Sequence, residues 1–245
     1  MAQLMWHGFR FDGRAGHESS LFEPIPPGMG SYLSKKPPDT IRIRTVFLRD
    51  PELFVIAMVR DPRAVITSRH ERKPDVYFSS FWRWERYVEA IEALREHPRY
   101  LIVRYEDLVA DPDAVQQHIA ERFPSLERIR LFTRYPEGAD IPEKARISLN
   151  GIRPVDRQGL ERWRQELPRL KGEVLRHPEL AAWLRRFGYE ENDEWSRCLD
   201  GVEPVHQSYK NELPGALRRT EASVRFAFKT VLYLRRRRLL FSHAA

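Results

Sequence analysis

An uncharged apolar run, residues 53–59, most constrains what this chain can fold into. Its seven residues are too few for a core helix, and an unbroken apolar run of this length is typical of a strand buried on both faces of a parallel sheet. Asp61 and Pro62 follow, and they supply an N-cap and a proline for the first position of a helix. The sequence therefore predicts a strand, a tight turn and a helix in this order.

Arg60 stands at the expected carboxyl end of this strand, where open α/β sheets bind their ligands. A helix N-terminus offers free backbone N–H groups, and a guanidinium adds a planar donor fork that fits a phosphate. We expect Ser68 and Arg69 further along the same helix, where they could add donors. A structural turn with Arg60 paired to a carboxylate is an equally good interpretation, so the local chemistry leaves both open.

A second strand and helix are predicted downstream. Apolar residues recur at three- and four-residue steps over residues 77–94, which predicts a long amphipathic helix that starts after the N-cap segment 73–75 and ends near His97. Its aromatic side chains favour core packing over sugar stacking. Residues 100–105 form the next predicted strand, and a helix should reach about Phe123. This β-α-β-α order predicts a parallel sheet with right-handed crossovers.

The charge of the chain is concentrated near its C-terminus. The formal net charge is +7, and residues 216–240 carry eight basic residues and one acid, which accounts for all of it. Arg225, Lys229 and Arg236 line one face of a predicted helix there, and apolar residues lie largely on another. Contact with an anionic membrane surface and packing on the domain are equally good interpretations. No nucleic-acid-binding signature occurs, so we expect no nucleic-acid partner.

Cysteine content and hydropathy indicate the cellular compartment in which the protein is expected. The single cysteine, Cys198, allows no internal disulfide, which fits a reducing compartment. Residues 1–11 lack the basic and apolar regions of a signal peptide, and no stretch reaches the roughly 18 apolar residues of a membrane-spanning helix. We therefore expect a cytoplasmic protein, held peripherally at the membrane if the basic segment binds lipid.

Residues 59–65 (Val-Arg-Asp-Pro-Arg-Ala-Val), with Ser68 and Arg69, resemble the 3′-phosphate-binding motif of sulfotransferases that use 3′-phosphoadenosine 5′-phosphosulfate (PAPS). Within this family, the amino-acid sequence of the motif most resembles that of the carbohydrate sulfotransferase branch. The resemblance implies an α/β, P-loop-like domain of three layers, in which helices flank a central parallel sheet. It also implies that Arg60 and Ser68 hold the 3′-phosphate, that no metal is needed, and that a sulfuryl group moves from PAPS to a hydroxyl, expected on a carbohydrate.

Three further segments carry the resemblance. Lys35 and Lys36 precede a proline, as in the family's lysine-proline segment, so either could reach the sulfonate or the bridging oxygen; a solvated basic loop is an equally good interpretation. Residues 103–108 resemble the strand behind the 3′-phosphate site, where we expect structural roles for the acids. The family places residues 128–151 and their surroundings near the nucleotide, which makes the arginines that lie there candidate phosphate ligands: Arg146, Arg153 and Arg157.

The family's first strand and its Arg-Ser-Gly-Thr-Thr-like loop are not recognisable in residues 1–29. That loop wraps the 5′-phosphosulfate in backbone N–H groups. We expect the strand and loop to be missing, with a degenerate replacement as the weaker alternative. The predicted organisation is an irregular segment 1–33, a sulfotransferase-like domain 34–190, and a polar linker with a basic amphipathic extension 191–245. Two rival functions follow: a truncated or non-catalytic relative that keeps only the 3′-phosphate site, and a basic-tailed protein that binds a membrane or a partner.

Overall fold

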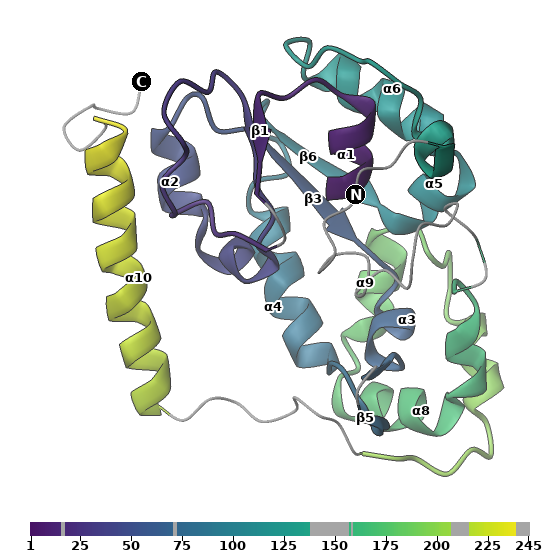
Figure 1. Ribbon diagram of the computed structural model, residues 1–245. Helices are drawn as coiled ribbons and strands as arrows, with labels where there is room; N and C mark the ends of the chain where they lie inside the picture. Colours follow the sequence, from purple (N-terminus) through teal and green to yellow (C-terminus); the bar gives the residue numbers. More distant parts are fainter. Residues whose placement is uncertain (16–17, 71–72, 138–156, 158, 207–215, 239–245) are drawn as a thin grey trace.

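A parallel pair of strands lies at the centre of the molecule (Figure 1). The computed structural model describes residues 1–15, 18–70, 73–137, 157, 159–206 and 216–238. Strand β3 (Val55–Val59) runs parallel to β6 (Tyr100–Arg104), with Val55 opposite Tyr100 and Val59 opposite Arg104. The predicted parallel pairing of these two segments is confirmed. The sheet is small, because it has two strands within the described ranges.

Both faces of this strand pair are covered, as the apolar run predicts. Ala57, Val59 and Tyr100 belong to one cluster of buried apolar residues, whereas Leu101 and Val103 belong to another. Successive side chains of a strand point to opposite faces, so the two clusters are the two sides of the sheet. The result is an α/β architecture of three layers: helices, a small sheet and helices.

Different parts of the chain form the two outer layers. One cluster joins the sheet to α2 (Arg44–Arg49), α4 (Phe81–Glu92), α8 (Leu167–Arg176), α9 (Leu180–Arg186) and the end of α10 (Ala216–Arg236). The other joins it to α1 (Ala2–Gly8), α5 (Tyr105–Ala110), α6 (Pro112–Arg122) and the 3-10 helix η2 (Phe132–Glu137).

The helix after β3 is shorter than predicted. Helix α3 (Pro62–Ile66) ends before Ser68, and the chain turns into β4 (Arg69–His70), which pairs antiparallel with β5 (Lys73–Tyr77). The hydroxyl of Thr67 donates to the carbonyl of Arg63 at 2.6 Å, which satisfies a terminal carbonyl of the helix. The prediction that Ser68 and Arg69 continue this helix is therefore wrong.

The long amphipathic helix also begins later and ends earlier than predicted. Residues 73–77 form β5 instead of an N-cap and first turn, and α4 starts at Phe81 and ends at Glu92. The carboxylate of Glu173, on α8, accepts the Phe81 backbone N–H at 2.6 Å. A distant residue thus satisfies the start of this helix, which local spacing does not reveal.

The N-terminal region holds more structure than the sequence indicates. Helix α1 is followed by β1 (Gly13–Arg14), which pairs in parallel with β2 (Tyr32–Leu33), and then by the 3-10 helix η1 (Pro37–Arg42). Leu4 and Met5 are 5% and 3% exposed, so α1 belongs to the core.

Residues after α9 pack back onto α8. The backbone N–H of Val205 donates to the carbonyl of Pro168 at 2.8 Å, and Lys171 Nζ donates to the carbonyl of Leu199 at 2.9 Å. Leu199 ends the 3-10 helix η4 (Glu194–Leu199) and is buried. The expected boundary between residues 190 and 191 stays a prediction.

Helix α10 packs against α2 at one edge of the molecule (Figure 1). The hydroxyl of Tyr233 donates to Asp50, which also receives Nε of Arg237 at 3.0 Å. Burial alone would raise the pKa of Asp50, but these two donors lower it below its usual value. None of the described helices is both long and apolar enough to cross a membrane.

Candidate functional site

Arg60 follows the last residue of β3, at the carboxyl edge of the parallel strands. Its guanidinium lies 4.6 Å from the ring centroid of Tyr105, the residue that follows β6, and Nη2 donates to the carbonyl of Gly159 at 2.8 Å. The indole N–H of Trp84 donates to the backbone carbonyl of Arg60 at 3.0 Å. These contacts fix both the backbone and the guanidinium where ligands of α/β proteins bind.

The carboxylates next to Arg60 are engaged elsewhere. Asp61 is paired with Arg63, and Glu106 accepts the Asp61 backbone N–H at 3.0 Å. Among the described residues, no carboxylate pairs with Arg60, and its buried Nε has no hydrogen-bond partner there. The described structure therefore gives no support to the turn in which a carboxylate neutralises Arg60. A buried donor without a partner and a charge without a counter-ion are features that an anion could satisfy.

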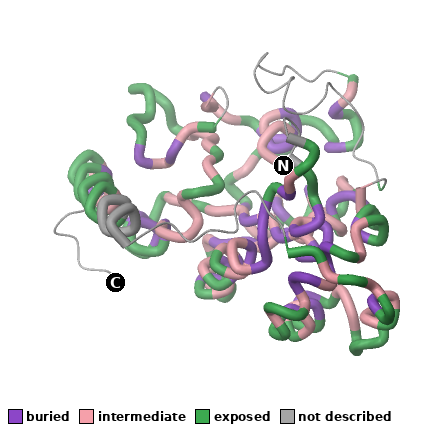
Figure 2. The backbone as a smooth tube through the Cα atoms, turned by 90° about the horizontal axis from the view of Figure 1, so that it is seen from below, coloured by how far each residue is buried: buried purple, intermediate pink, exposed green. Residues whose placement is uncertain are grey.

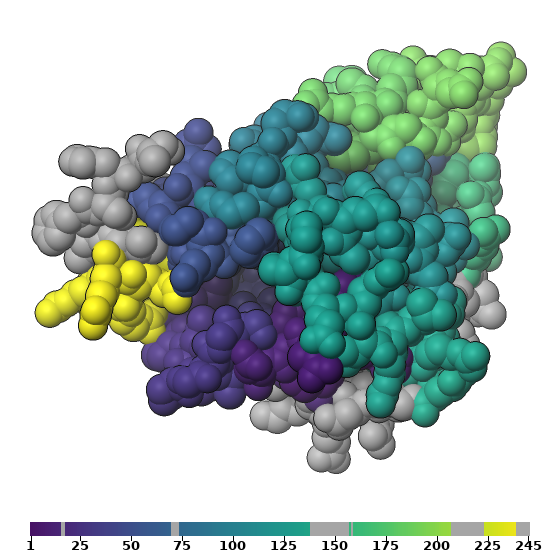
Figure 3. All heavy atoms as spheres, turned by 90° about the horizontal axis from the view of Figure 1, so that it is seen from above, coloured from purple at the N-terminus to yellow at the C-terminus, as the bar shows by residue number. Residues whose placement is uncertain are grey.

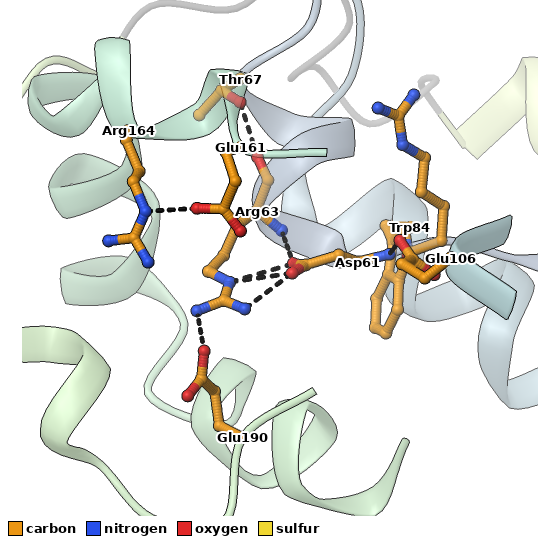
Figure 4. Close-up of polar contacts among 9 residues, drawn as sticks. Asp61, Arg63, Thr67, Trp84, Glu106, Glu161, Arg164 and Glu190 are labelled. Atoms are coloured by element: carbon orange, nitrogen blue, oxygen red, sulfur yellow. Dashed lines mark hydrogen bonds and ion pairs between the residues drawn. The ribbon is translucent and has the colours of Figure 1, made fainter. Parts of the chain in front are cut away.

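Arg63, three residues on, is structural (Figure 4). It is 4% exposed, and its Nη2 lies 2.7 Å from Asp61 while Nη1 pairs with Glu190. Its guanidinium also lies 4.4 Å from the ring centroid of Trp163 and 5.3 Å from that of Trp195. Burial alone would lower the pKa of Arg63, but Asp61 and Glu190 raise it, so this cation is held by the fold.

The N-terminus of α3 is already capped. The Asp61 carboxylate accepts the backbone N–H of Arg63 at 2.8 Å. This cap satisfies one of the free N–H groups of the helix terminus. The Arg63 N–H is therefore not available to an external anion, and anion binding at this edge would rely more on side chains such as Arg60.

Ser68 and Arg69 differ in what they can offer. Ser68 is exposed in the turn between α3 and β4, and its carbonyl accepts the backbone N–H of Phe78 at 2.8 Å. Seven residues lie between it and Arg60, and the five of these that form α3 rise about 8 Å at 1.5 Å per residue. Arg69 makes a bidentate pair with Glu166, at 2.8 and 2.7 Å, and bonds Tyr77. Arg69 thus joins β4 to α8, and Ser68 remains a candidate ligand.

The other predicted site residues lie in three different settings. Arg157 is exposed, with Nη2 3.5 Å from the carbonyl of Ala110, and it lies two residues before Gly159, the partner of Arg60. The fold thus brings this arginine's segment to the Arg60 edge. Lys35 and Lys36 pair with Glu18 at 2.9 and 3.5 Å on the surface. Arg146 and Arg153 lie outside the described residues.

A second group of buried polar atoms adjoins Arg60. Val59 pairs with Arg104 across the strands, which places Arg104 at the same edge. Its guanidinium lies 4.6 Å from the ring centroid of Tyr189. Burial, together with the carboxylates of Glu106 and Asp61, raises the pKa of the Tyr189 hydroxyl well above its usual range. The hydroxyl is therefore neutral at physiological pH and can donate a hydrogen bond.

Sequence reasoning missed several residues that shape this edge. Arg63 carried a signal, because a cation two residues after an N-cap aspartate can fold back onto it. Its other partner, Glu190, is 127 positions away, and neither periodicity nor spacing connects the two. Glu106 accepts the Asp61 backbone N–H, which fits the structural role expected for the acids of residues 103–108. Within the described ranges, no group of three or more His, Cys, Asp or Glu residues could hold a metal ion.

Comparison with known proteins gives a distant similarity. No protein-family model matches the chain, and no solved structure matches it. A protein-tyrosine sulfotransferase of Drosophila melanogaster is 25% identical over 185 residues, which are 69% of this chain and 36% of that relative's length. The chain therefore spans well under two thirds of the relative. The similarity supports the sulfotransferase family, without singling out the carbohydrate branch or bearing on the 5′-phosphosulfate loop.

Proposed function

We propose that the chain transfers a sulfuryl group from PAPS to a hydroxyl, and that Arg60 anchors the 3′-phosphate. The observation that carries this proposal is the guanidinium of Arg60 at the carboxyl edge of β3, which is held by Tyr105 and Gly159 and pairs with no carboxylate of the described residues. The similarity to a sulfotransferase over 69% of the chain points to the same chemistry. A fixed guanidinium suits a phosphate because its planar donors can bind two oxygens at once.

The residues around Arg60 fit a nucleotide phosphate. A Cβ on residue 159 would lie 3.3 Å from Arg60 Nη2, which is a close contact. A glycine at this position therefore lets the guanidinium lie where it does. Ser68 would add a hydroxyl donor from the turn after α3, and Arg157 would add charge from beside Gly159. Arg153 is proposed as a further phosphate ligand. The buried Nε of Arg60, without a partner among the described residues, is a donor that a phosphate oxygen could meet.

PAPS would supply the activated sulfuryl group, and the chain would hold and orient its reactants. Transfer is an in-line displacement, in which positioning and charge stabilisation carry most of the effect. Lys35 and Lys36 are the proposed cations for the bridging oxygen. In the present structure both pair with Glu18 at the surface, so they would have to leave that carboxylate to act. No metal ion has a role in this proposal.

The proposed acceptor is a carbohydrate hydroxyl, because the Arg-Asp-Pro-Arg-Ala-Val motif most resembles that of carbohydrate sulfotransferases. A tyrosine hydroxyl is the second candidate, and the similarity to a protein-tyrosine sulfotransferase favours it. The two acceptors can be separated by offering an oligosaccharide and a tyrosine peptide in one reaction. Label found in the peptide alone would reject the carbohydrate assignment.

Transfer of ³⁵S-labelled sulfate from PAPS tests this proposal. We expect label in an acceptor, unchanged by EDTA, and a loss of at least about tenfold in Lys35→Met/Lys36→Met if these lysines steady the leaving oxygen. Arg10→Met is the matched control, because Arg10 also pairs with a carboxylate on the surface, Glu127 at 2.7 Å. Tight binding of adenosine 3′,5′-bisphosphate without any transfer would instead support the non-catalytic relative.

A further inference from the structure

We propose that the outward face of α10 binds an anionic lipid surface. This outer face consists of Val224, Phe228, Val231 and Leu232, which are 66%, 64%, 50% and 39% exposed. The helix lies at the margin of the molecule (Figure 3), and the exposed fractions of these four side chains show that this face is accessible to a partner. This inference concerns a surface distinct from the Arg60 edge and does not depend on sulfuryl transfer.

The opposite side of α10 is the side that packs on the protein. Tyr233 and Leu234 are 7% and 2% exposed, and the ring centroid of Phe226 lies 4.6 Å from that of Phe22. The hydroxyl of Tyr233 donates to the buried Asp50. The helix therefore already has its core contacts, and the outer face is not needed to hold it in place.

The outer face is continuous along the helix. At about 100° per residue, its four members fall within an arc of roughly 100°, and Tyr233 lies on the other side of the helix. Figure 2 shows α10 largely exposed along its described length. Scattered apolar residues on a surface are ordinary, but four on one helical stripe form a patch, and such patches mark interaction sites.

The charged residues around the outer face indicate which kind of partner it binds. Arg225, Lys229 and Arg236 fall on one flank of the outer face, and Arg235 falls within its arc; all four are exposed. Residues 222–238 contain no acid. A second copy of the chain would bring these cations against one another, which disfavours self-association. An apolar stripe edged by cations fits the interface of an anionic bilayer, where apolar side chains enter and cations meet headgroups.

Co-sedimentation of the full chain with vesicles tests this proposal. We expect binding to phosphatidylcholine vesicles that contain about 30% phosphatidylserine, weak binding to phosphatidylcholine alone, and loss of binding as salt rises. Phe228→Gln should weaken binding about tenfold or more. Leu175→Gln, at a residue 62% exposed on α8, is the matched control and should bind as the parent does.

Charge variants test the electrostatic part. Arg225→Gln/Lys229→Gln should weaken binding about thirtyfold at low salt, because each cation near an anionic surface is worth about fivefold. Arg134→Gln/Arg197→Gln, which removes two exposed cations elsewhere, should change binding little. Equal binding to neutral and anionic vesicles, or unchanged binding by Phe228→Gln, would overturn the proposal. So would a concentration-dependent dimer, or a complex with an acidic protein, that Phe228→Gln abolishes while vesicles do not bind.

Discussion

Replacing Arg63 by Met should destabilise the protein strongly, although Arg63 belongs to the same Arg-Asp-Pro-Arg motif as the proposed ligand Arg60. Arg63 is 4% exposed, and Asp61, its main partner, is 6% exposed. Removing one partner of a buried ion pair leaves a buried charge uncompensated and costs about 3–5 kcal/mol. At about 2–4 °C per kcal/mol for a chain of this size, the melting temperature should fall by roughly 6–20 °C.

Arg164 provides the matched control for this variant. Its guanidinium lies 4.4 Å from the ring centroid of Trp163, as that of Arg63 does, and it pairs with Glu161. Its side chain is 56% exposed, so Arg164→Met should cost only about 0–1 kcal/mol. Urea unfolding of the two variants measures the difference. If both variants lose the same free energy, or if Arg63→Met loses less than about 1 kcal/mol, burial of the Arg63 pair is not what stabilises this edge.

Three further outcomes are expected. Glu173→Gln should cost about 3–5 kcal/mol in urea unfolding, since it strands a buried arginine and weakens the bond to Phe81; a loss below 1 kcal/mol would contradict this. Because the pKa of Asp50 is lowered by folding, its charged form adds to the free energy of unfolding fully above its usual pKa of 3.8, and this stabilisation is lost as pH falls through the lower pKa of the folded protein. Asp50→Asn should therefore reduce the loss of stability on acidification. Gly159→Ala should lower affinity for adenosine 3′,5′-bisphosphate several-fold by displacing Arg60; unchanged affinity would place the nucleotide elsewhere.

The sequence was most informative where the structural signal is local. An apolar run of seven residues predicted β3, and residues 100–105 predicted β6, because strands buried on both faces leave no polar positions. Asp61 and Pro62 predicted the start of α3 for the same reason: N-capping involves neighbours in sequence. The position of Arg60 at the carboxyl edge followed from these two elements.

Long-range contacts explain what the sequence could not predict. Helix α4 begins at Phe81, where Glu173, 92 positions away, accepts its first N–H, and this contact has no local signature. The β4–β5 hairpin is likewise joined to α8 by Arg69 and Glu166, which are 97 positions apart. The sequence pattern placed an N-cap at residues 73–75 and the helix directly after it, because these tertiary partners are not visible in local spacing.

The candidate site also combines features that local sequence predicts with features that depend on long-range contacts. Arg60 could be chosen from its place after a strand, but the engagement of Asp61 by Arg63 and of Glu106 by the Asp61 backbone depended on the fold. These contacts leave Arg60 without a carboxylate among the described residues, which favours the proposed anion site over a structural turn. The C-terminal helix shows the same limit, since its packed and outward faces are told apart by tertiary contacts such as that of Tyr233 with Asp50.

Isothermal titration of two nucleotides against two proteins tests the role of Arg60 most directly. Adenosine 3′,5′-bisphosphate and adenosine 5′-monophosphate differ only in the 3′-phosphate, so the parent chain and Arg60→Gln form a cycle that isolates one contact. We predict that Arg60→Gln weakens the bisphosphate by about 10- to 100-fold, the worth of a charge-assisted hydrogen bond, and leaves the monophosphate within about twofold. Equal losses for both nucleotides, or no loss for the bisphosphate, would contradict the assignment of Arg60 to the 3′-phosphate.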